Sequence, residues 1–277
     1  MATEALFMSF LEKKLPFSVA AYAKYLYAHE ERDKNTIHAW ALKENGAIQG
    51  AIVRSGSTVY PVFNDEVKNF EEILSFFFEK NSMDAARLVF HGKARDIELL
   101  ERYAEERGLQ PGDRIIYDFM TTADTPPLQE LRASPPGLII RQPGVSDIDR
   151  LFPLQAGYEQ EEVLPKNGKF DPAVCRMLLE RLVKHERILI AELGGRIVGK
   201  INTNAETPSW AQIGGVYVHP SYRKRGIATR MTAIFVQGLL EEGRRASLFV
   251  KKEKPATRDM YGRVGFKVVG DYRITYY

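Results

Sequence analysis

The chain has 277 residues, of which 44% are hydrophobic and 27% charged, so it is long enough for two ordinary domains and has a globular composition. No apolar run approaches the length of a membrane span, and the start, MATEALFMSF, lacks the pattern of a signal peptide. The single cysteine, Cys175, excludes an internal disulfide, which suits a reducing cytoplasm. Because Cys175 falls in an apolar helical pattern, we expect it to pack in a core rather than act as a nucleophile.

The net charge of +3 is divided unevenly along the chain. Residues 1–136 carry a net charge of −5, and residues 137–277 carry +8. A basic half favours an anionic partner, either a polyanionic cofactor or nucleic acid. We disfavour nucleic acid, because the basic residues are not interleaved with aromatic residues that could stack on bases.

Residues 1–120 show helical and strand patterns in a regular order. Apolar residues recur at helical spacing through the first 30 residues, around Pro16. Strands and helices are then expected from period-two and helical patterns: strands at Ile37–Leu42, Ala51–Arg54, Thr58–Phe63, Arg87–Phe90 and Arg114–Met120, and helices at Phe70–Phe78 and Ile97–Tyr103. Residues 121–137, TTADTPPLQELRASPPG, contain two Pro-Pro pairs, so we predict a domain linker there.

Residues 138–277 are predicted to form a second domain. Its expected elements are a strand at Leu138–Arg141, helices at Asp147–Val163 and Asp171–Glu186, strands at Ile188–Glu192, Ile197–Asn202 and Gln212–Val218, a helix from Ile227, a strand at Ala246–Lys251, a helix at Ala256–Val264 and a strand at Phe266–Tyr277. No His, Cys, Asp or Glu residues have the spacing of metal ligands, so no metal is expected.

The stretch IGGVYVHPSYRKRGIATRMTA, residues 213–233, carries the chemistry of this half. A strand is expected to end at Pro220, and a helix is expected to follow the turn RKRGIA, residues 223–228. In that turn Gly226 permits close approach of a ligand to the backbone. Three cations lie beside the first helical amides, which have no partner within the helix, so the turn suits a phosphate or pyrophosphate. An ordinary solvated basic turn is the alternative.

The turn resembles the cofactor signature of the GNAT acyltransferases, which is Arg or Gln, two variable residues, Gly, one variable residue, then Gly or Ala. A second segment, LFVKKEKPATRDMYGRVGF, residues 248–266, is similar to the next strand and helix of that family. The resemblance implies an α+β (α/β three-layer) fold, in which a mixed, mostly antiparallel sheet is flanked by helices. Because residues 1–120 repeat nearly the same order of elements, we expect tandem GNAT-like domains.

The first of these two units departs from the signature. After its third strand begins it reads YPVFNDEV, residues 60–67, without Arg-x-x-Gly and with Asp65 and Glu66, which would repel a pyrophosphate. We therefore predict that it binds no CoA and serves as a scaffold or as a wall of the substrate site. An unrelated α/β domain is the alternative.

The resemblance implies an acetyl-CoA-dependent N-acyltransferase that moves an acetyl group to a primary amine by direct attack. Backbone groups of Val216, Tyr217 and Val218 would hold the pantetheine arm, and Gly214-Gly215 would permit a bulge in this strand. The residues implied to bind the phosphates are Arg223, Lys224, Arg225, Gly226, Ile227, Ala228 and Thr229. Lys254 stands where the family often has Asn, and it would contact either the pantetheine or, with Arg258 nearby, a phosphate. Tyr261 matches the tyrosine that protonates the leaving thiolate.

Several questions stay open at this level. The general base is one of Glu159, Glu161, Glu162 and Glu206, or none of them, since a Glu-rich helix end is commonly solvated. His219, before Pro220, is expected to be structural. The acceptor is undetermined, although the acidic first half slightly favours a cationic one. The last strand, Tyr272–Tyr277, is a candidate to pair across a homodimer. A non-catalytic acyl-CoA-binding or regulatory protein on the same fold is the alternative function.

Overall fold

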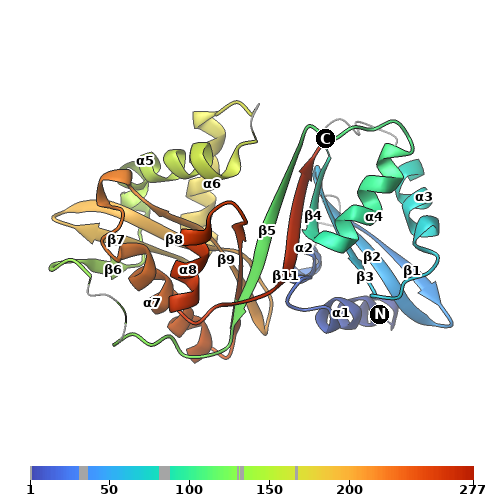
Figure 1. Cartoon of the computed structure of the whole chain (residues 1–277), viewed down its shortest axis with the longest axis horizontal. Coiled ribbons are helices and arrows are strands. Elements are labelled where there is room, and N and C mark those ends of the chain that lie inside the picture. The colour runs from blue at the N-terminus through green and yellow to red at the C-terminus, as the bar shows by residue number, and fades with distance from the viewer. Residues whose placement is uncertain (1, 31–36, 81–87, 130, 132–133, 166–167) are drawn as a thin grey trace.

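The computed structural model describes residues 2–30, 37–80, 88–129, 131, 134–165 and 168–277. Its centre is one 11-stranded sheet in the order β1-β2-β3-β4-β11-β5-β10-β9-β8-β7-β6, with helices packed on both faces (Figure 1). The elements of the first half are α1 (Ala2–Lys13), α2 (Val19–Glu30), β1 (Ile37–Glu44), β2 (Ala47–Ser55), β3 (Thr58–Phe63), α3 (Phe70–Lys80), β4 (Val89–Lys93), α4 (Ala94–Glu105) and β5 (Asp113–Thr122).

The second half follows after residues 123–138. Its elements are β6 (Ile139–Arg141), the 3-10 turn η2 (Val145–Asp147), α5 (Ile148–Tyr158), the π-helical turn η3 (Glu159–Val163), α6 (Pro172–His185), β7 (Ile188–Leu193), β8 (Arg196–Glu206), β9 (Trp210–Val218), η4 (Pro220–Tyr222), α7 (Ile227–Glu241), β10 (Arg245–Lys251), α8 (Pro255–Arg263) and β11 (Lys267–Tyr276). The predicted mixed, mostly antiparallel sheet flanked by helices is confirmed.

The predicted elements differ from the structure mainly at their ends. The strand expected from Arg87 begins at Val89 in the described residues, since residues 81–87 lie outside them. The strand expected to end at Met120 continues as β5 to Thr122, two residues into the predicted linker. Residues 130, 132 and 133 of that linker lie outside the described residues. The helix predicted over Asp147–Val163 is divided into η2, α5 and η3.

The two halves exchange strands at the middle of the sheet. Strand β11, the last of the chain, lies between β4 and β5 of the first half and is antiparallel to both. Strand β5 in turn pairs with β10 of the second half through Tyr117–Thr122. Figure 1 shows β5 and β11 side by side between the two groups of helices. Because both edges of β11 are hydrogen-bonded within the chain, Tyr272–Tyr277 does not offer the free edge that pairing across a homodimer would require, and that expectation was wrong.

Apolar clusters attach the helices to the two faces of the sheet. On one face α7 and α8 pack on β8, β9 and β10 through a large core that contains Ile213, Met231 and Val250. On the other face α5 and α6 pack on β7 and β9 around Leu151 and Leu179. Helix α2 of the first half also reaches the second half, where Val19 and Ala20 contact Ala205 of β8. The two halves therefore share both strands and core.

Within the described residues, none of the helices is both long enough and apolar enough to cross a membrane.

Candidate active site

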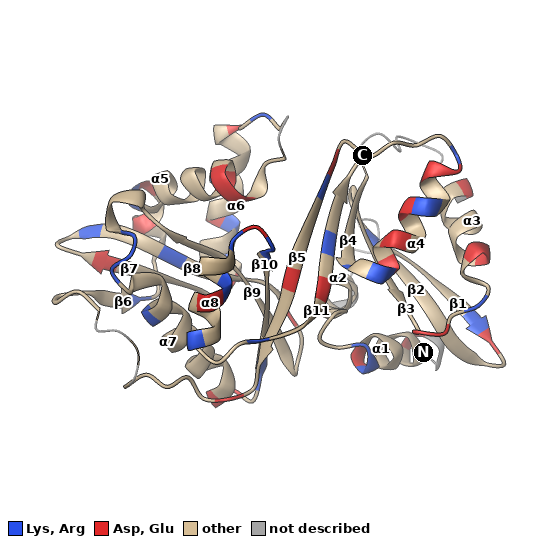
Figure 2. Ribbon diagram, viewed as in Figure 1, with Lys and Arg blue, Asp and Glu red and all other residues tan. Residues whose placement is uncertain are grey.

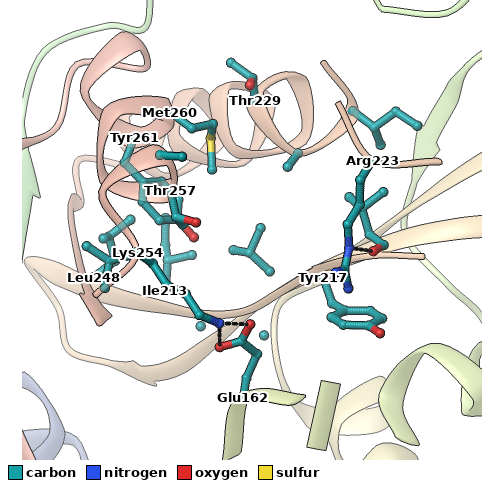
Figure 3. A pocket seen from close by; sticks show the side chains of 18 of the residues that line it. Glu162, Ile213, Tyr217, Arg223, Thr229, Leu248, Lys254, Thr257, Met260 and Tyr261 are labelled. Carbon is teal, nitrogen blue, oxygen red and sulfur yellow. Dashed lines mark hydrogen bonds and ion pairs between the residues drawn. The ribbon is translucent and has the colours of Figure 1, made fainter. Parts of the chain in front are cut away.

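A gap between two neighbouring strands forms the main cavity. Strands β9 and β10 are parallel, but they pair only where Arg245–Ser247 lie beside Trp210–Gln212. Beyond this point the strands separate, β9 continuing to Val218 and β10 to Lys251. A cavity of about 1250 Å³ lies between the separated strands. It is lined by both strands, by η3 and by the starts of α7 and α8 (Figure 3).

The wall formed by β9 contains the bulge that the Gly-Gly pair predicts. Lys200 of β8 is paired with Tyr217 and Asn202 with Gly214, so Gly215 and Val216 lie opposite a single residue. Gly215 has φ of +59°, and a Cβ there would overlap Asn202 Oδ1 and Lys200 Nζ. Only glycine adopts this conformation without strain, and only glycine fits so close to the neighbouring side chains. The bulge takes Val216 out of regular pairing beside the cavity.

The basic turn has the geometry of an anion site but does not bring its three cations to one point. Gly226, with φ of +78°, is the N-cap of α7 and supplies no side chain to the first amides of the helix. Arg223 donates from Nε to the carbonyl of Val218 at 2.9 Å and from its terminal nitrogen to Glu161 at 2.7 Å. Arg225 instead donates to the carbonyl of Ser221 and lies over the Tyr222 ring.

Most of the predicted site residues line this one cavity. Those that do are Val216, Tyr217, Val218, Arg223, Lys224, Gly226, Ile227, Ala228, Thr229, Lys254 and Tyr261. Arg225 is not among the lining residues. This grouping joins the signature turn and the segment around Tyr261, which are separate in the sequence. The roles of these residues stay predictions.

Tyr261 lies on α8 with its ring inside the core. Its side chain is buried and meets Phe266 edge-on, with ring centroids 5.9 Å apart. Burial, and then the neighbouring Tyr158 and Glu162, raise the pKa of the Tyr261 phenol. A raised pKa keeps the hydroxyl protonated. In Figure 3 Tyr261, Thr257 and Met260 occupy the same side of the cavity, opposite Tyr217.

Two of the four candidate carboxylates reach the cavity, and both are paired. Glu161 accepts hydrogen bonds from the Tyr217 hydroxyl at 2.6 Å and from Arg223 at 2.7 Å. Burial opposes ionisation of Glu161, but these two hydrogen bonds outweigh it and lower the pKa of the carboxyl. Glu162 accepts from Lys254 Nζ at 2.6 and 2.8 Å (Figure 3). Lys254 therefore meets a carboxylate of the protein, at a position where Asn is common in the family.

The other candidates bind elsewhere. Glu159 accepts from Gln155 at 2.9 Å, and Glu206 pairs with Arg187 and Arg244; neither carboxylate lines the cavity. Arg258 pairs with Asp118 of β5 at 3.4 Å instead of turning to the cavity.

Cys175 and His219, which we expect to be structural, lie outside the lining of the cavity. Cys175 is 3% exposed within α6. His219 Nδ1 accepts from the Ser221 amide at 3.3 Å and so caps the turn η4. Among the residues that the structure describes, no group of three or more His, Cys, Asp or Glu is arranged to hold a metal.

Sequence reasoning missed a buried cation beneath the bulge. Lys200 is fully buried, its Nζ donates to Asn202 Oδ1 at 2.9 Å, and it lies 4.5 Å from the Tyr158 ring centroid. Burial lowers the pKa of Lys200 to about 7. The Tyr158 hydroxyl accepts from the Gly215 amide at 3.3 Å, so the cluster supports the bulge from below. The one signal in the sequence was a lysine inside the apolar run IVGKI, residues 197–201.

Sequence reasoning also missed a cavity residue from the first half. Tyr117 of β5 lines the cavity beside Phe249 of β10, with ring centroids 4.9 Å apart at 73°. The exchange of strands brings it there, and no local pattern around residue 117 indicates it.

The first half has a different arrangement where the second has its basic turn. Asp65, after β3, is paired with Lys93 at 2.7 Å, and the Phe63 amide donates to Asp96 at 3.1 Å. Burial raises the pKa of Asp96 to about 6, although the Phe63 amide acts against this rise. These contacts occupy polar groups of the turn with partners from β4 and α4. The prediction that this unit binds no CoA stays a prediction.

Comparison with known proteins finds a family model that is similar to part of the chain. Residues 151–266 match the model of the acetyltransferase (GNAT) family. A search of curated protein sequences finds no match. The match covers the bulge, the basic turn and Tyr261, and it ends at Phe266.

Solved structures extend the likeness to the entire chain. A Drosophila protein is 10% identical with a TM-score of 0.74, and the alignment covers 100% of this chain and 96% of that one. A tandem GNAT protein from the clavulanic acid biosynthesis pathway is 13% identical with a TM-score of 0.60, covering 99% and 93%. A GNAT-family acetyltransferase from Colwellia psychrerythraea is 10% identical with a TM-score of 0.57, covering 99% and 95%. At these identities the likeness concerns the fold.

Proposed function

Because residues 151–266 match the model of the GNAT acetyltransferase family, we propose that the protein is an acetyl-CoA-dependent N-acyltransferase whose acceptor is a primary amine. The observation that carries the proposal is the single cavity that joins the basic turn at Gly226, the bulge at Gly215 and the Tyr261 side chain. The cavity is large enough for a long, narrow ligand. The phosphate end of acetyl-CoA would lie at the first amides of α7. There Gly226 leaves the backbone accessible, and α7 presents the positive end of its dipole.

Bound acetyl-CoA would supply an acetyl group activated as a thioester. The backbone of Val216–Val218 would orient this group, because the bulge leaves Val216 outside the ladder with β8 and none of the three residues pairs with β10. An amide directed at the developing oxyanion favours the transition state over the ground state. Tyr261 holds its proton because of its raised pKa, and it would deliver that proton to the departing sulfur. The acceptor amine must be neutral to attack, and its lost proton would pass to solvent or to a carboxylate on η3.

The competing function is a non-catalytic acyl-CoA-binding or regulatory protein. It would use the same turn and the same cavity, so the two functions differ only in turnover. We favour the enzyme because the proton donor and the bulge lie in the same cavity as the phosphate-type turn.

Titration calorimetry with acetyl-CoA and with CoA tests the cofactor. We expect binding by the natural protein and none by Gly226→Trp, whose ring would fill the turn. The matched control is Gly238→Trp, on α7, where a Cβ meets nothing within 4 Å. Absence of binding by the natural protein would contradict both functions.

Replacing Tyr261 with Phe then separates the two functions. For the enzyme we expect kcat to fall on the order of 100-fold, because proton transfer by a positioned side chain contributes about 10²–10⁴-fold. The affinity for acetyl-CoA should change little. Release of CoA thiol in a screen of primary amines measures the rate. If the natural protein binds acetyl-CoA but acetylates no amine, the regulatory function is supported instead.

A further inference from the structure

The cavity is lined by residues from both faces of the sheet, and the two faces differ in their linings. On β10, Leu248 and Val250 belong to the core under α7 and α8, whereas Phe249 belongs to the aromatic cluster on the opposite face. Side chains alternate along a strand, so Lys251 lies on the same face as Phe249. The basic turn begins α7 on the first face. If acetyl-CoA enters from that face, the acceptor must approach from the face of Phe249 and Lys251.

Lys251 is a half-buried cation at this end of the cavity, with little to bind it. Its side chain is 15% exposed, and it lines the cavity. Within the part of the chain that the structure describes, its one ion pair is a long contact of 3.9 Å to Glu162 Oε2. The same carboxylate is already bound by Lys254 at 2.6 Å. Lys251 therefore has no close carboxylate partner among the described residues, and a mostly buried ammonium group in such a place favours an anionic ligand.

Aromatic residues line the same part of the cavity as Lys251. Tyr117 is its direct cross-strand neighbour on β5, and such neighbours have side chains in contact range. Phe249 lies edge-on to Tyr117 and stacks on Tyr272 at 5.1 Å and 2°. Tyr158 on α5 lines the cavity as well. The acceptor end thus combines aromatic rings with Lys251 and the neighbouring Lys254–Glu162 ion pair.

The balance of charge in the cavity argues against a polycationic acceptor. Both lining carboxylates are paired, Glu161 with Arg223 and Glu162 with Lys254. The lining also contains Lys224, Lys251 and Arg263, which have no further lining carboxylates to balance them. The net charge of the lining side chains is therefore positive. Figure 2 shows basic and acidic residues together near β10 and α8. A polyamine would therefore find no unpaired carboxylate among the described residues that line the cavity. This argues against the cationic acceptor that the acidic charge of the first half slightly favoured.

We propose that the acceptor carries a carboxylate as well as its amine on an apolar body, with the chemistry of an aromatic or large aliphatic amino acid. Lys251 binds the carboxylate, Tyr117 and Phe249 contact the apolar body, and the amine points into the gap between β9 and β10. The inference rests on the proposed function and adds the class of substrate. It also gives the first half a part in the site, since Tyr117 belongs to it.

Matched pairs of amines that differ only in the carboxylate test this proposal. We would measure kcat/KM at saturating acetyl-CoA for L-phenylalanine against 2-phenylethylamine, and for L-leucine against isoamylamine. A charge-assisted hydrogen bond contributes enough to favour the carboxylated member by about 10-fold or more. Lys251→Met should remove most of this preference, and Lys251→Arg should retain part of it. Lys252→Met is the matched control, because Lys252 is 44% exposed and pairs with Asp271 outside the cavity.

Other outcomes would overturn the proposal. Equal or better use of the amines without a carboxylate by the natural protein contradicts it, as does a preference that survives in Lys251→Met. If Lys251→Met instead weakens acetyl-CoA binding in calorimetry and leaves the preference unchanged, Lys251 serves the cofactor. Failure of the natural protein to bind acetyl-CoA is a failure of the proposed function, and titration of the same protein with L-phenylalanine and 2-phenylethylamine then decides separately whether the acceptor end selects a carboxylate.

Discussion

Lys200 lies in none of the sequence motifs, yet its side chain contacts the bulge that forms one wall of the cavity. A lysine ammonium loses its hydration when buried, and here one carboxamide oxygen and the face of one tyrosine replace the water. That exchange is incomplete, which is why burial lowers the pKa of Lys200 to about 7. The Lys200 side chain nevertheless occupies the space next to Gly215, so it helps to hold the bulge in place.

The folded protein should therefore become more stable relative to the unfolded chain as the pH rises from 7 toward 10.5. In that window the unfolded chain holds the Lys200 proton and the folded protein has released it. Lys200→Met removes this pH dependence. The free energy of unfolding of the variant, compared with that of the natural protein, should therefore be higher at pH 6 than at pH 9 by about 2 kcal/mol. Urea unfolding at the two pH values measures the difference.

Lys43→Met is the control, because Lys43 is exposed on β1. An equal effect of Lys200→Met at both pH values would show that Lys200 does not release its proton within the range tested.

At the scale of elements, the bulge in β9 depends on its glycine. Two residues of β9 face one of β8, and Gly215 takes a positive φ where the side chains of Asn202 and Lys200 on β8 leave no room for a Cβ. Strand β9 also diverges from β10 just beyond Gln212. The bulge and the divergence together open the cavity, so a change at Gly215 should affect binding as well as stability.

We expect Gly215→Ala to lower the free energy of unfolding by about 1–3 kcal/mol, since the methyl group would displace Asn202 and Lys200 and the backbone would be strained. Acetyl-CoA affinity should fall at least about 10-fold because the bulge must shift. Thermal unfolding and calorimetry measure the two effects.

Gly238→Ala in α7 is the matched control. A Cβ there meets nothing within 4 Å, and alanine favours a helix, so this variant should be slightly more stable and bind acetyl-CoA normally. Normal binding by Gly215→Ala would show that the site does not need the bulge.

At the scale of the whole molecule, the exchange of β5 and β11 joins the halves. Strand β11 of the second half lies between β4 and β5 of the first half, and β5 in turn lies beside β10 of the second half. The aromatic cluster that contains Phe119, Tyr272 and Phe249 lies across this junction. Two units that share central strands cannot unfold separately without losing ladders in both. We therefore expect one cooperative transition, unlike two domains joined only by a linker.

The two tryptophans allow this to be measured. Trp40 lies on β1 of the first half and Trp210 on β9 of the second, so Trp40→Phe and Trp210→Phe each leave a probe in one half. The two variants should have coincident urea transitions when followed by fluorescence and by circular dichroism. Adding Tyr272→Ala should shift both transitions together, since loss of a fully buried aromatic ring costs about 3–5 kcal/mol.

Val269→Ala, an exposed position on the same strand, is the control and should shift neither. Transitions that separate, or a response of only one probe to Tyr272→Ala, would show that the halves are independent.

The sequence by itself determined most of the elements and predicted an anion site at the basic turn. Periodicity, prolines and glycines identified the described helices and strands, because these signals are local. The Gly-Gly pair predicted the bulge, and the basic turn and Tyr261 were recognisable because each lies within one short segment. Only the tertiary structure decided that Tyr117 reaches the cavity, that Lys254 meets Glu162 and that the last strand completes the first half. Those facts depend on which strands become neighbours, and strand order is set by packing and pairing between residues more than 100 positions apart, as for Lys251 and Tyr117.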